Sequence, residues 1–175
     1  MVYNITMGLQ INLYKCSDDA EMLKSEELFD ICDRVFEKLG IKANNLILYV
    51  NYIDKQEMID ANLKFRDIHH GTNMLSFQAK DFDYAVLFEE NNENIELGHI
   101  AMNKEIIEEE AIKLNCSIHD RCLMLFVHGL LTLCGYDGKT DENWNKKLEI
   151  EDEICLSYNI TDCVHDNVYD DADVA

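Results

Sequence analysis

The sequence predicts a single domain of the α/β (α+β) class, with one mixed central β-sheet packed by helices. A 47% hydrophobic fraction in 175 residues is enough for one core without help from disulfides. Apolar residues follow a spacing of two in some segments and of three and four in others, in the order strand, helix, strand, helix, strands, helices. We expect residues 1–158 to form the domain, and residues 159–175 to form an acidic, mobile tail.

The first half of the chain alternates strands and helices. Residues 9–14 alternate apolar and polar side chains, which is typical of a half-buried strand. Residues 22–39 have the apolar spacing of an amphipathic helix that ends at Gly40. Residues 45–53 are rich in β-branched and aromatic side chains and predict a buried strand, which a short helix over residues 54–66 follows.

Two more strands are expected, over residues 73–77 and 95–102. The segment DFDYAVLF at residues 81–88 lies between them and is interpreted as a further strand, with a solvated ENNEN loop after it. From Lys104 onward the pattern becomes helical.

Three helices follow in the second half. The first covers residues 104–115. The second runs from Ile118 to Cys134, and Ser117 with Asp120 fits the capping-box pattern at its start. The third begins near Thr140 and reaches Ile154. The glutamate runs at residues 108–110 and 149–153 are interpreted as solvated helix faces, not as ligand clusters.

Charge and cysteine content narrow the class of protein. The formal net charge of −20 opposes general attraction to phosphate backbones, so contact with RNA must be local, and neither DNA nor membrane is an expected partner. No apolar run approaches the roughly 20 residues that span a bilayer, and no signal-peptide pattern is present, so we expect a cytoplasmic protein. The seven cysteines form no CxxC pair and are interpreted as reduced thiols.

The segment from His128 to Gly138, HGLLTLCGYDG, has the outline of a metal site. Residues four apart on a helix project from the same face, so side chains at positions 128 and 132 could bind one metal. A third ligand just past the helix end would complete the set. The arrangement resembles the signature HGxLHLxGYDH of the YbeY family, which comprises single-strand-specific, zinc-dependent endoribonucleases implicated in ribosomal RNA maturation and ribosome quality control.

Three other segments carry the same resemblance, in the order that the family has. Residues 62–66 (NLKFR) are similar to its asparagine-x-x-tyrosine-arginine segment, residues 72–77 (TNMLSF) to its T-[DN]-V-L-S-F strand, and residues 97–100 (LGHI) to its L-G-D-I strand. Together the four blocks cover residues 45–155. The resemblance implies the YbeY-like fold, and action on single-stranded ribosomal RNA together with the ribosomal subunit or its proteins.

The chain departs from the family pattern at four positions. His128 aligns with the first zinc ligand, but Thr132 and Gly138 stand where the other two histidines belong. His99 replaces the aspartate of L-G-D-I, and Gln78 replaces a proline. Catalytic zinc sites normally use three protein ligands and a water, so His128 alone would not hold the zinc that the resemblance implies.

Other residues could replace the missing ligands. Asp137 and Asp141 flank the third position, Cys134 lies two residues beyond Thr132, and His99 offers a new imidazole. An oxygen-rich set would suit Mg or Mn rather than zinc.

The resemblance assigns catalytic roles to Arg66 and His128. Arg66 would bind a phosphate and stabilise charge on a phosphorus oxygen. Without the resemblance, Arg66 would be interpreted as a surface ion pair and His128 as a packed histidine.

Two functions stay open. One is a metal-dependent endoribonuclease in ribosomal RNA processing, weakened or with substituted ligands. The other is a catalytically inactive family member that binds the ribosome or a protein.

Overall fold

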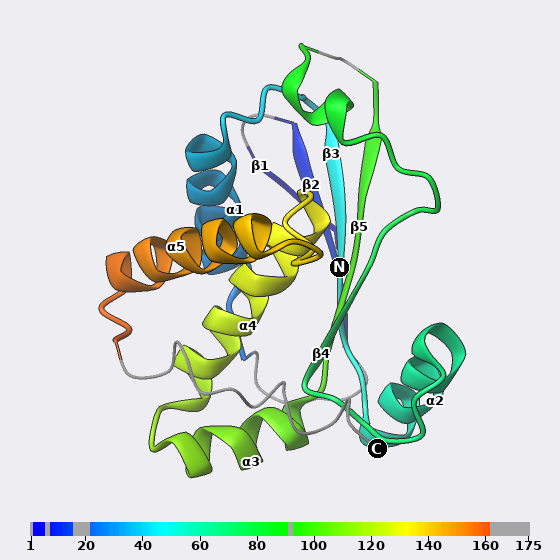
Figure 1. Cartoon of the computed structure of the whole chain (residues 1–175), viewed down its shortest axis with the longest axis vertical. Helices are drawn as coiled ribbons and strands as arrows, with labels where there is room; N and C mark the ends of the chain where they lie inside the picture. Colours follow the sequence, from blue (N-terminus) through cyan, green and yellow to red (C-terminus); the bar gives the residue numbers. More distant parts are fainter. Residues whose placement is uncertain (1, 6–7, 16–21, 91–92, 162–175) are drawn as a thin grey trace.

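A five-stranded mixed sheet forms the centre of the molecule, and its strand order is β1-β2-β3-β5-β4 (Figure 1). The computed structural model describes residues 2–5, 8–15, 22–90 and 93–161. The inner strands β2, β3 and β5 are parallel, and the edge strands β1 and β4 are antiparallel to their neighbours. The elements in chain order are β1 (Val2–Ile5), β2 (Leu9–Lys15), α1 (Ser25–Leu39), β3 (Leu46–Tyr52), α2 (Lys55–Arg66), β4 (Met74–Phe77), η1 (Tyr84–Phe88), β5 (Ile95–Met102), α3 (Lys104–Leu114), α4 (Ile118–Leu133) and α5 (Asp141–Ser157).

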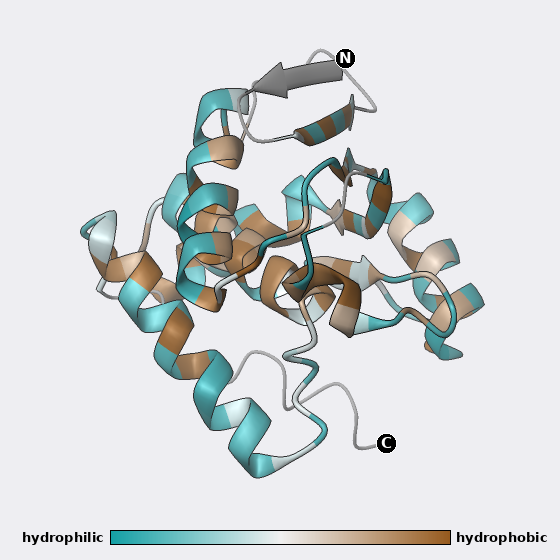
Figure 2. Ribbon diagram, turned by 90° about the horizontal axis from the view of Figure 1, so that it is seen from above, coloured by the Kyte–Doolittle hydropathy of each residue, from teal (hydrophilic) through white to brown (hydrophobic). Residues whose placement is uncertain are grey.

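The helices cover the two faces of the sheet unequally. Helices α1, α4 and α5 lie on one face, whereas α2 lies on the other (Figure 1). The main core forms between α4 and the sheet, and Figure 2 shows the most hydrophobic ribbon gathered at the centre of the molecule. A small separate cluster packs α2 against its own face through Met58, Leu75 and Ala101. The sheet therefore separates the helix of Arg66 from the helix of His128.

The predicted mixed sheet packed by helices is confirmed, with one correction between β4 and β5. Residues 81–88 were expected to include a strand, but Tyr84–Phe88 form a 3₁₀ helix. The Asp83 carboxylate accepts a hydrogen bond from the backbone N–H of Ala85 at 3.0 Å, which starts the turn. Leu87 is fully buried, and its carbonyl accepts from the backbone of residues 42 and 43 instead of from a strand partner. Strand β1, which the sequence pattern did not reveal, pairs with β2.

The predicted helix starts are found at Ser117 and Thr140. The Ser117 hydroxyl accepts from the backbone N–H of Asp120 at 2.9 Å, and the Thr140 hydroxyl accepts from that of Asn143 at 3.2 Å. After α5 the chain packs back on the core through Ile160, and the acidic tail from residue 162 lies outside the described residues. Within the described ranges, no helix has the length and apolar character needed to cross a membrane.

A buried ion pair joins α3, α4 and β4. The guanidinium of Arg121 donates to Glu110 Oε2 from Nε at 2.9 Å and from Nη2 at 2.8 Å. The side-chain amide of Asn73 donates to the same carboxylate at 2.9 and 3.0 Å. Glu110 was expected on a solvated face, and that expectation was wrong, because Arg121 draws it into the interior. The network sets the position of three elements with charge-assisted hydrogen bonds.

Replacing Arg121 by methionine should lower the free energy of unfolding by about 3–5 kcal/mol, because it leaves the Glu110 carboxylate buried without its counter-charge. Chemical denaturation of the two proteins measures the difference. Arg34→Met is the matched control, since Arg34 pairs with Asp30 on the surface of α1. Its loss should stay below about 1 kcal/mol. Equal losses in the two variants would contradict the assignment.

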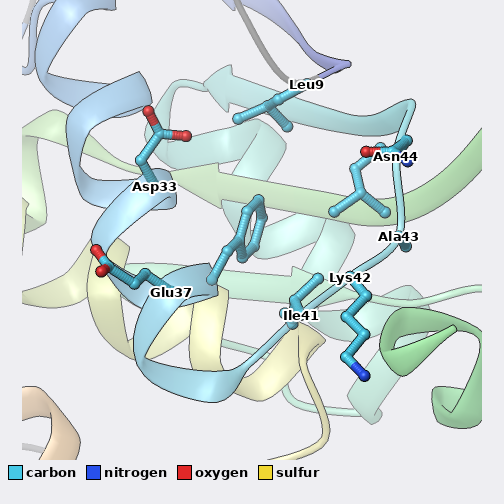
Figure 3. Close-up of a pocket in the computed structure, with 9 residues that line it drawn as sticks. Leu9, Asp33, Glu37, Ile41, Lys42, Ala43 and Asn44 are labelled. Atoms are coloured by element: carbon cyan, nitrogen blue, oxygen red, sulfur yellow. The ribbon is translucent and has the colours of Figure 1, made fainter. Parts of the chain in front are cut away.

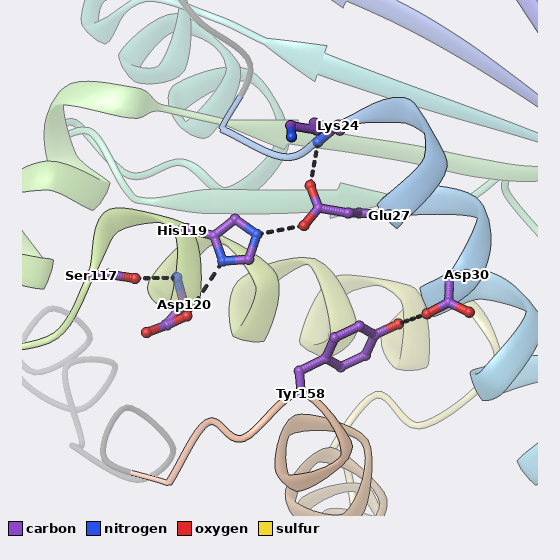
Figure 4. Close-up of polar contacts among 7 residues, drawn as sticks. All are labelled: Lys24, Glu27, Asp30, Ser117, His119, Asp120 and Tyr158. Carbon is purple, nitrogen blue, oxygen red and sulfur yellow. Dashed lines mark hydrogen bonds and ion pairs between the residues drawn. The ribbon is translucent and has the colours of Figure 1, made fainter.

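A surface ion pair links α1 to the start of α4 (Figure 4). His119 Nε2 lies 2.7 Å from Glu27 Oε1, and Nδ1 lies 3.3 Å from Asp120 Oδ1. Burial alone would lower the pKa of His119, but these carboxylates outweigh it and raise that pKa above its usual value. Burial alone would raise the pKa of Glu27, but the Lys24 backbone N–H and His119 outweigh it and lower that pKa.

The two shifts define a pH window. A raised histidine pKa contributes stability that is present below the unfolded value of about 6.5 and is lost as pH rises through the folded pKa. A lowered glutamate pKa contributes stability above its unfolded value and loses it in acid. His119→Gln should therefore lower the melting temperature at pH 5.5–6 and have little effect at pH 8.5. Because the pair is half exposed, we expect a loss of at most about 1 kcal/mol. An effect of equal size at both pH values would contradict the ion pair.

Candidate functional site

His128 and Thr132 meet a lysine ammonium from the neighbouring helix. Both residues lie in the last turns of α4, on the side that faces α5. The Nζ atom of Lys147 is 2.8 Å from His128 Nε2 and 2.7 Å from Thr132 Oγ1. Lys147 is only 2% exposed. The ammonium therefore lies between the two positions that correspond to the first two ligands of the motif.

The other ring nitrogen of His128 faces a buried carboxylate. Nδ1 lies 2.7 Å from Glu151 Oε1, and Glu151 is 2% exposed. An ammonium can only donate, so His128 Nε2 must accept, and the proton of the neutral ring is then on Nδ1, toward Glu151. Burial lowers the pKa of Lys147 to about 8, although the carboxylates of Glu151 and Asp137 oppose this change. Lysine, histidine and carboxylate thus form one polar chain between α4 and α5.

The two substituted ligand positions have other contacts. The Thr132 hydroxyl donates to the backbone carbonyl of His128 at 2.9 Å, one helical turn earlier. The backbone N–H of Gly138 donates to Asn143 Oδ1 at 2.8 Å, and the Asn143 amide donates to the carbonyl of Gly135 at 3.1 Å. Gly138 has φ +75°, and a Cβ there would lie 2.9 Å from a ring atom of Trp144. A side chain at position 138 would therefore be strained.

The proposed replacement ligands do not converge on His128. Asp137 pairs with Lys139, which lowers the pKa of its carboxyl group although burial opposes the change. Asp141 lies exposed in the first turn of α5. Burial raises the pKa of the Cys134 thiol to about 12, so this sulfur stays protonated and is a poor ligand at neutral pH.

His99 lies on the opposite face of the sheet. Gly129 of α4 packs against Ile100, and side chains alternate along a strand, so His99 points away from α4. Its ring stacks on Tyr49 with centroids 4.4 Å apart, and Nε2 lies 3.2 Å from Glu96 Oε1. His99 therefore belongs to the uncovered face, together with Tyr49 and Tyr14.

Arg66 is the last residue of α2 and is exposed. Its helix packs on the face of the sheet that α4 does not cover, as the cluster of Met58, Leu75 and Ala101 shows. The predicted site residues are thus brought together only in part: His128 and Thr132 meet in one cluster, while Arg66 and His99 belong to elements or faces on the other side.

The residues present do not fit a metal ion. The lone pair of His128 Nε2 faces an ammonium, the Thr132 hydroxyl proton is given to a carbonyl, and Gly138 has no donor atom. Among residues 2–5, 8–15, 22–90 and 93–161, no group of three histidine, cysteine, aspartate or glutamate side chains could hold a metal. Neither zinc nor Mg or Mn has the three protein ligands that such a site requires.

Sequence analysis missed Lys147 and misjudged Glu151, which was expected on a solvated face. Both belong to α5, three or four residues from the buried Ile150 and Ile154. The signal was therefore present: charged residues at the helical spacing of a buried stripe lie on the inner face. Glu151 is buried because His128 and Lys147 lie opposite it.

A cavity of about 440 Å³ lies elsewhere, between α1 and the segment that leads into β3 (Figure 3). Phe36 and Ile41 contribute its apolar wall, and Asp33, Glu37 and Lys42 contribute charged groups. Burial and the nearby Asp30 raise the pKa of Asp33. None of the predicted site residues lines this cavity.

Comparisons with known proteins agree with the motif analysis. The family model described as Endoribonuclease YbeY matches residues 13–159. The chain is 35% identical over 130 residues to the endoribonuclease YbeY of Buchnera aphidicola subsp. Schizaphis graminum, which covers 71% of this chain and 78% of that protein. It is 32% identical over 142 residues to that of Clostridioides difficile, covering 78% and 90%. The solution structure of TM1509 from Thermotoga maritima has a TM-score of 0.53 at 19% identity, covering 90% and 97%, and supports the fold.

Lys147→Met should lower the free energy of unfolding by about 3 kcal/mol, because it removes the cation that offsets the buried Glu151 carboxylate and leaves two polar groups of α4 without their partner. Lys146→Met is the matched control: this neighbouring lysine is exposed and contacts Glu149 on the surface of the same helix. Denaturation with urea should show little change for the control. Equally small losses in both variants would mean that Lys147 contributes nothing to the packing of α5.

Proposed function

We propose a role in ribosomal RNA maturation for this chain, which belongs to the endoribonuclease YbeY family. The family match extends over residues 13–159 and so includes every residue discussed as part of the site. Within this role, we propose that the chain binds single-stranded ribosomal RNA, or the ribosomal subunit that carries it, and does not cut RNA with a metal-activated water.

One observation supports binding over metal-dependent cleavage. Metal-activated hydrolysis needs an open coordination position beside three protein ligands. The only histidine of the motif, His128, directs its Nε2 lone pair at Lys147, and Thr132 directs its hydroxyl at a backbone carbonyl. Without those ligands no bound water can become the nucleophile by that route.

Arg66 is the residue we propose for contact with RNA. A guanidinium binds phosphate oxygens with paired hydrogen bonds, and this one is exposed at the end of α2. A net charge of −20 makes general attraction to RNA unfavourable, so recognition would depend on a few such contacts and would weaken with salt. The location that suits this work is the cytoplasm.

Endoribonuclease activity is the second candidate, and the similarity to endoribonucleases over most of the chain favours it. In that case Arg66 and His128 would act as catalytic residues in a weakened reaction. Arg66 would stabilise charge on the phosphate, and His128 would supply a ring nitrogen.

The test measures binding and cleavage on the same full-length protein. We expect it to co-sediment with ribosomal subunits or to shift a single-stranded ribosomal RNA fragment, and to leave that RNA uncut with or without added zinc. Arg66→Ala should weaken binding by about tenfold, since one lost charged contact corresponds to about 1–2 kcal/mol.

Arg34→Ala provides the control for charge, because Arg34 is also an exposed helical arginine and lies on α1. It should leave binding unchanged. Cleavage that EDTA abolishes, or one zinc per purified chain, would exclude the binding role as stated. Cleavage that EDTA does not affect, but that His128→Ala abolishes, would favour the second candidate.

A further inference from the structure

We propose that the ammonium of Lys147 is a built-in replacement for the metal ion, held at the place between positions 128 and 132 where a metal would bind. Three observations support this: the contacts of 2.8 and 2.7 Å to His128 Nε2 and Thr132 Oγ1, the 2% exposure of Lys147, and its origin in a different helix from the two residues that it joins. The inference rests on the family assignment and not on whether the chain binds or cuts RNA.

The polarity of the cluster is that of a metal-bound histidine. In metal sites the coordinating ring nitrogen gives its lone pair to the cation, and the other nitrogen donates its proton to a carboxylate or carbonyl behind it. Here Nε2 of His128 gives its lone pair to the ammonium, and Nδ1 lies 2.7 Å from Glu151 Oε1. Lysine has taken the cation's place while the histidine and the carboxylate have kept the roles of ligand and support.

The charges of the cluster also balance as they would around a metal. Glu151 is a carboxylate at 2% exposure, and such a group requires a nearby positive charge. Lys147 supplies this charge from one helical turn earlier on α5, and its Nζ lies 5.8 Å from the centre of the Trp144 ring, within cation–π range. The contact between α4 and α5 therefore needs no ion from solution.

An ammonium in this position excludes a metal. Two cations cannot occupy one place, and the lone pair of His128 cannot serve both. Restoring a histidine at position 132 would thus be insufficient for metal binding while Lys147 is present. The lysine, in addition to the missing histidines, keeps the site free of metal.

The first experiment observes the ammonium directly in the unaltered protein. Proton–nitrogen NMR on ¹⁵N-lysine-labelled protein should reveal one slowly exchanging ammonium signal, which is lost in Lys147→Met and kept in Lys146→Met. One equivalent of zinc should leave the signal unchanged. Absence of such a signal, or its loss on addition of zinc, would overturn the proposal. Loss of RNA binding, by contrast, would affect only the proposed function.

The second experiment asks whether removing the lysine opens the site. Thr132→His combined with Lys147→Met places two imidazoles one turn apart without the competing cation, and Thr132→His combined with Lys146→Met is the matched control. Titration with Co²⁺, followed by its visible absorption, should give affinity about tenfold or more higher for the first protein, a change of the size seen when groups around a metal site are altered. Equal affinities, including no binding by either, would contradict exclusion by Lys147. Circular dichroism checks that both proteins are folded.

Discussion

The burial of α4 is the constraint on which the rest of the structure depends. This helix lies between the sheet and the other helices, so nearly every polar side chain on it must find a partner inside the protein. Arg121 near its start is paired with Glu110 of α3, and His128 near its end is joined to Lys147 of α5. The apolar faces hold the layers together, but these two polar contacts determine how α3 and α5 are positioned against the central helix.

Periodicity and helix capping were sufficient to predict most of the fold, because these signals lie within short segments. Ser117 and Thr140 start their helices as expected. Residues 84–88 were misjudged because their apolar side chains carry no signal of a missing strand partner, and the actual turn depends on Asp83 and on contacts with the distant residues 42 and 43. Glu110 was misjudged for a similar reason: a glutamate between other glutamates is normally solvated, unless a distant arginine is buried opposite it.

The site was predictable in position but not in composition. His128 and Thr132 share a face at the end of α4, as helical geometry requires, and the sequence alone reveals that two histidines are missing. A search for replacement ligands considers atoms with lone pairs, and so turned to Asp137, Asp141 and His99. The compensation is instead a positive charge, which no ligand search can find. Only the packing of α5 on α4 brings Lys147 into the cluster.

The ammonium between α4 and α5 also makes the loss of the metal site hard to reverse. A histidine returned to position 132 alone would face a buried cation, and a neutral side chain at position 147 alone would leave Glu151 without a counter-charge. A side chain at position 138 would press on Trp144. Each step back is therefore costly until the others have been made. Evolution could leave this arrangement only by several changes together, which makes the lysine a lock on the present state of the protein.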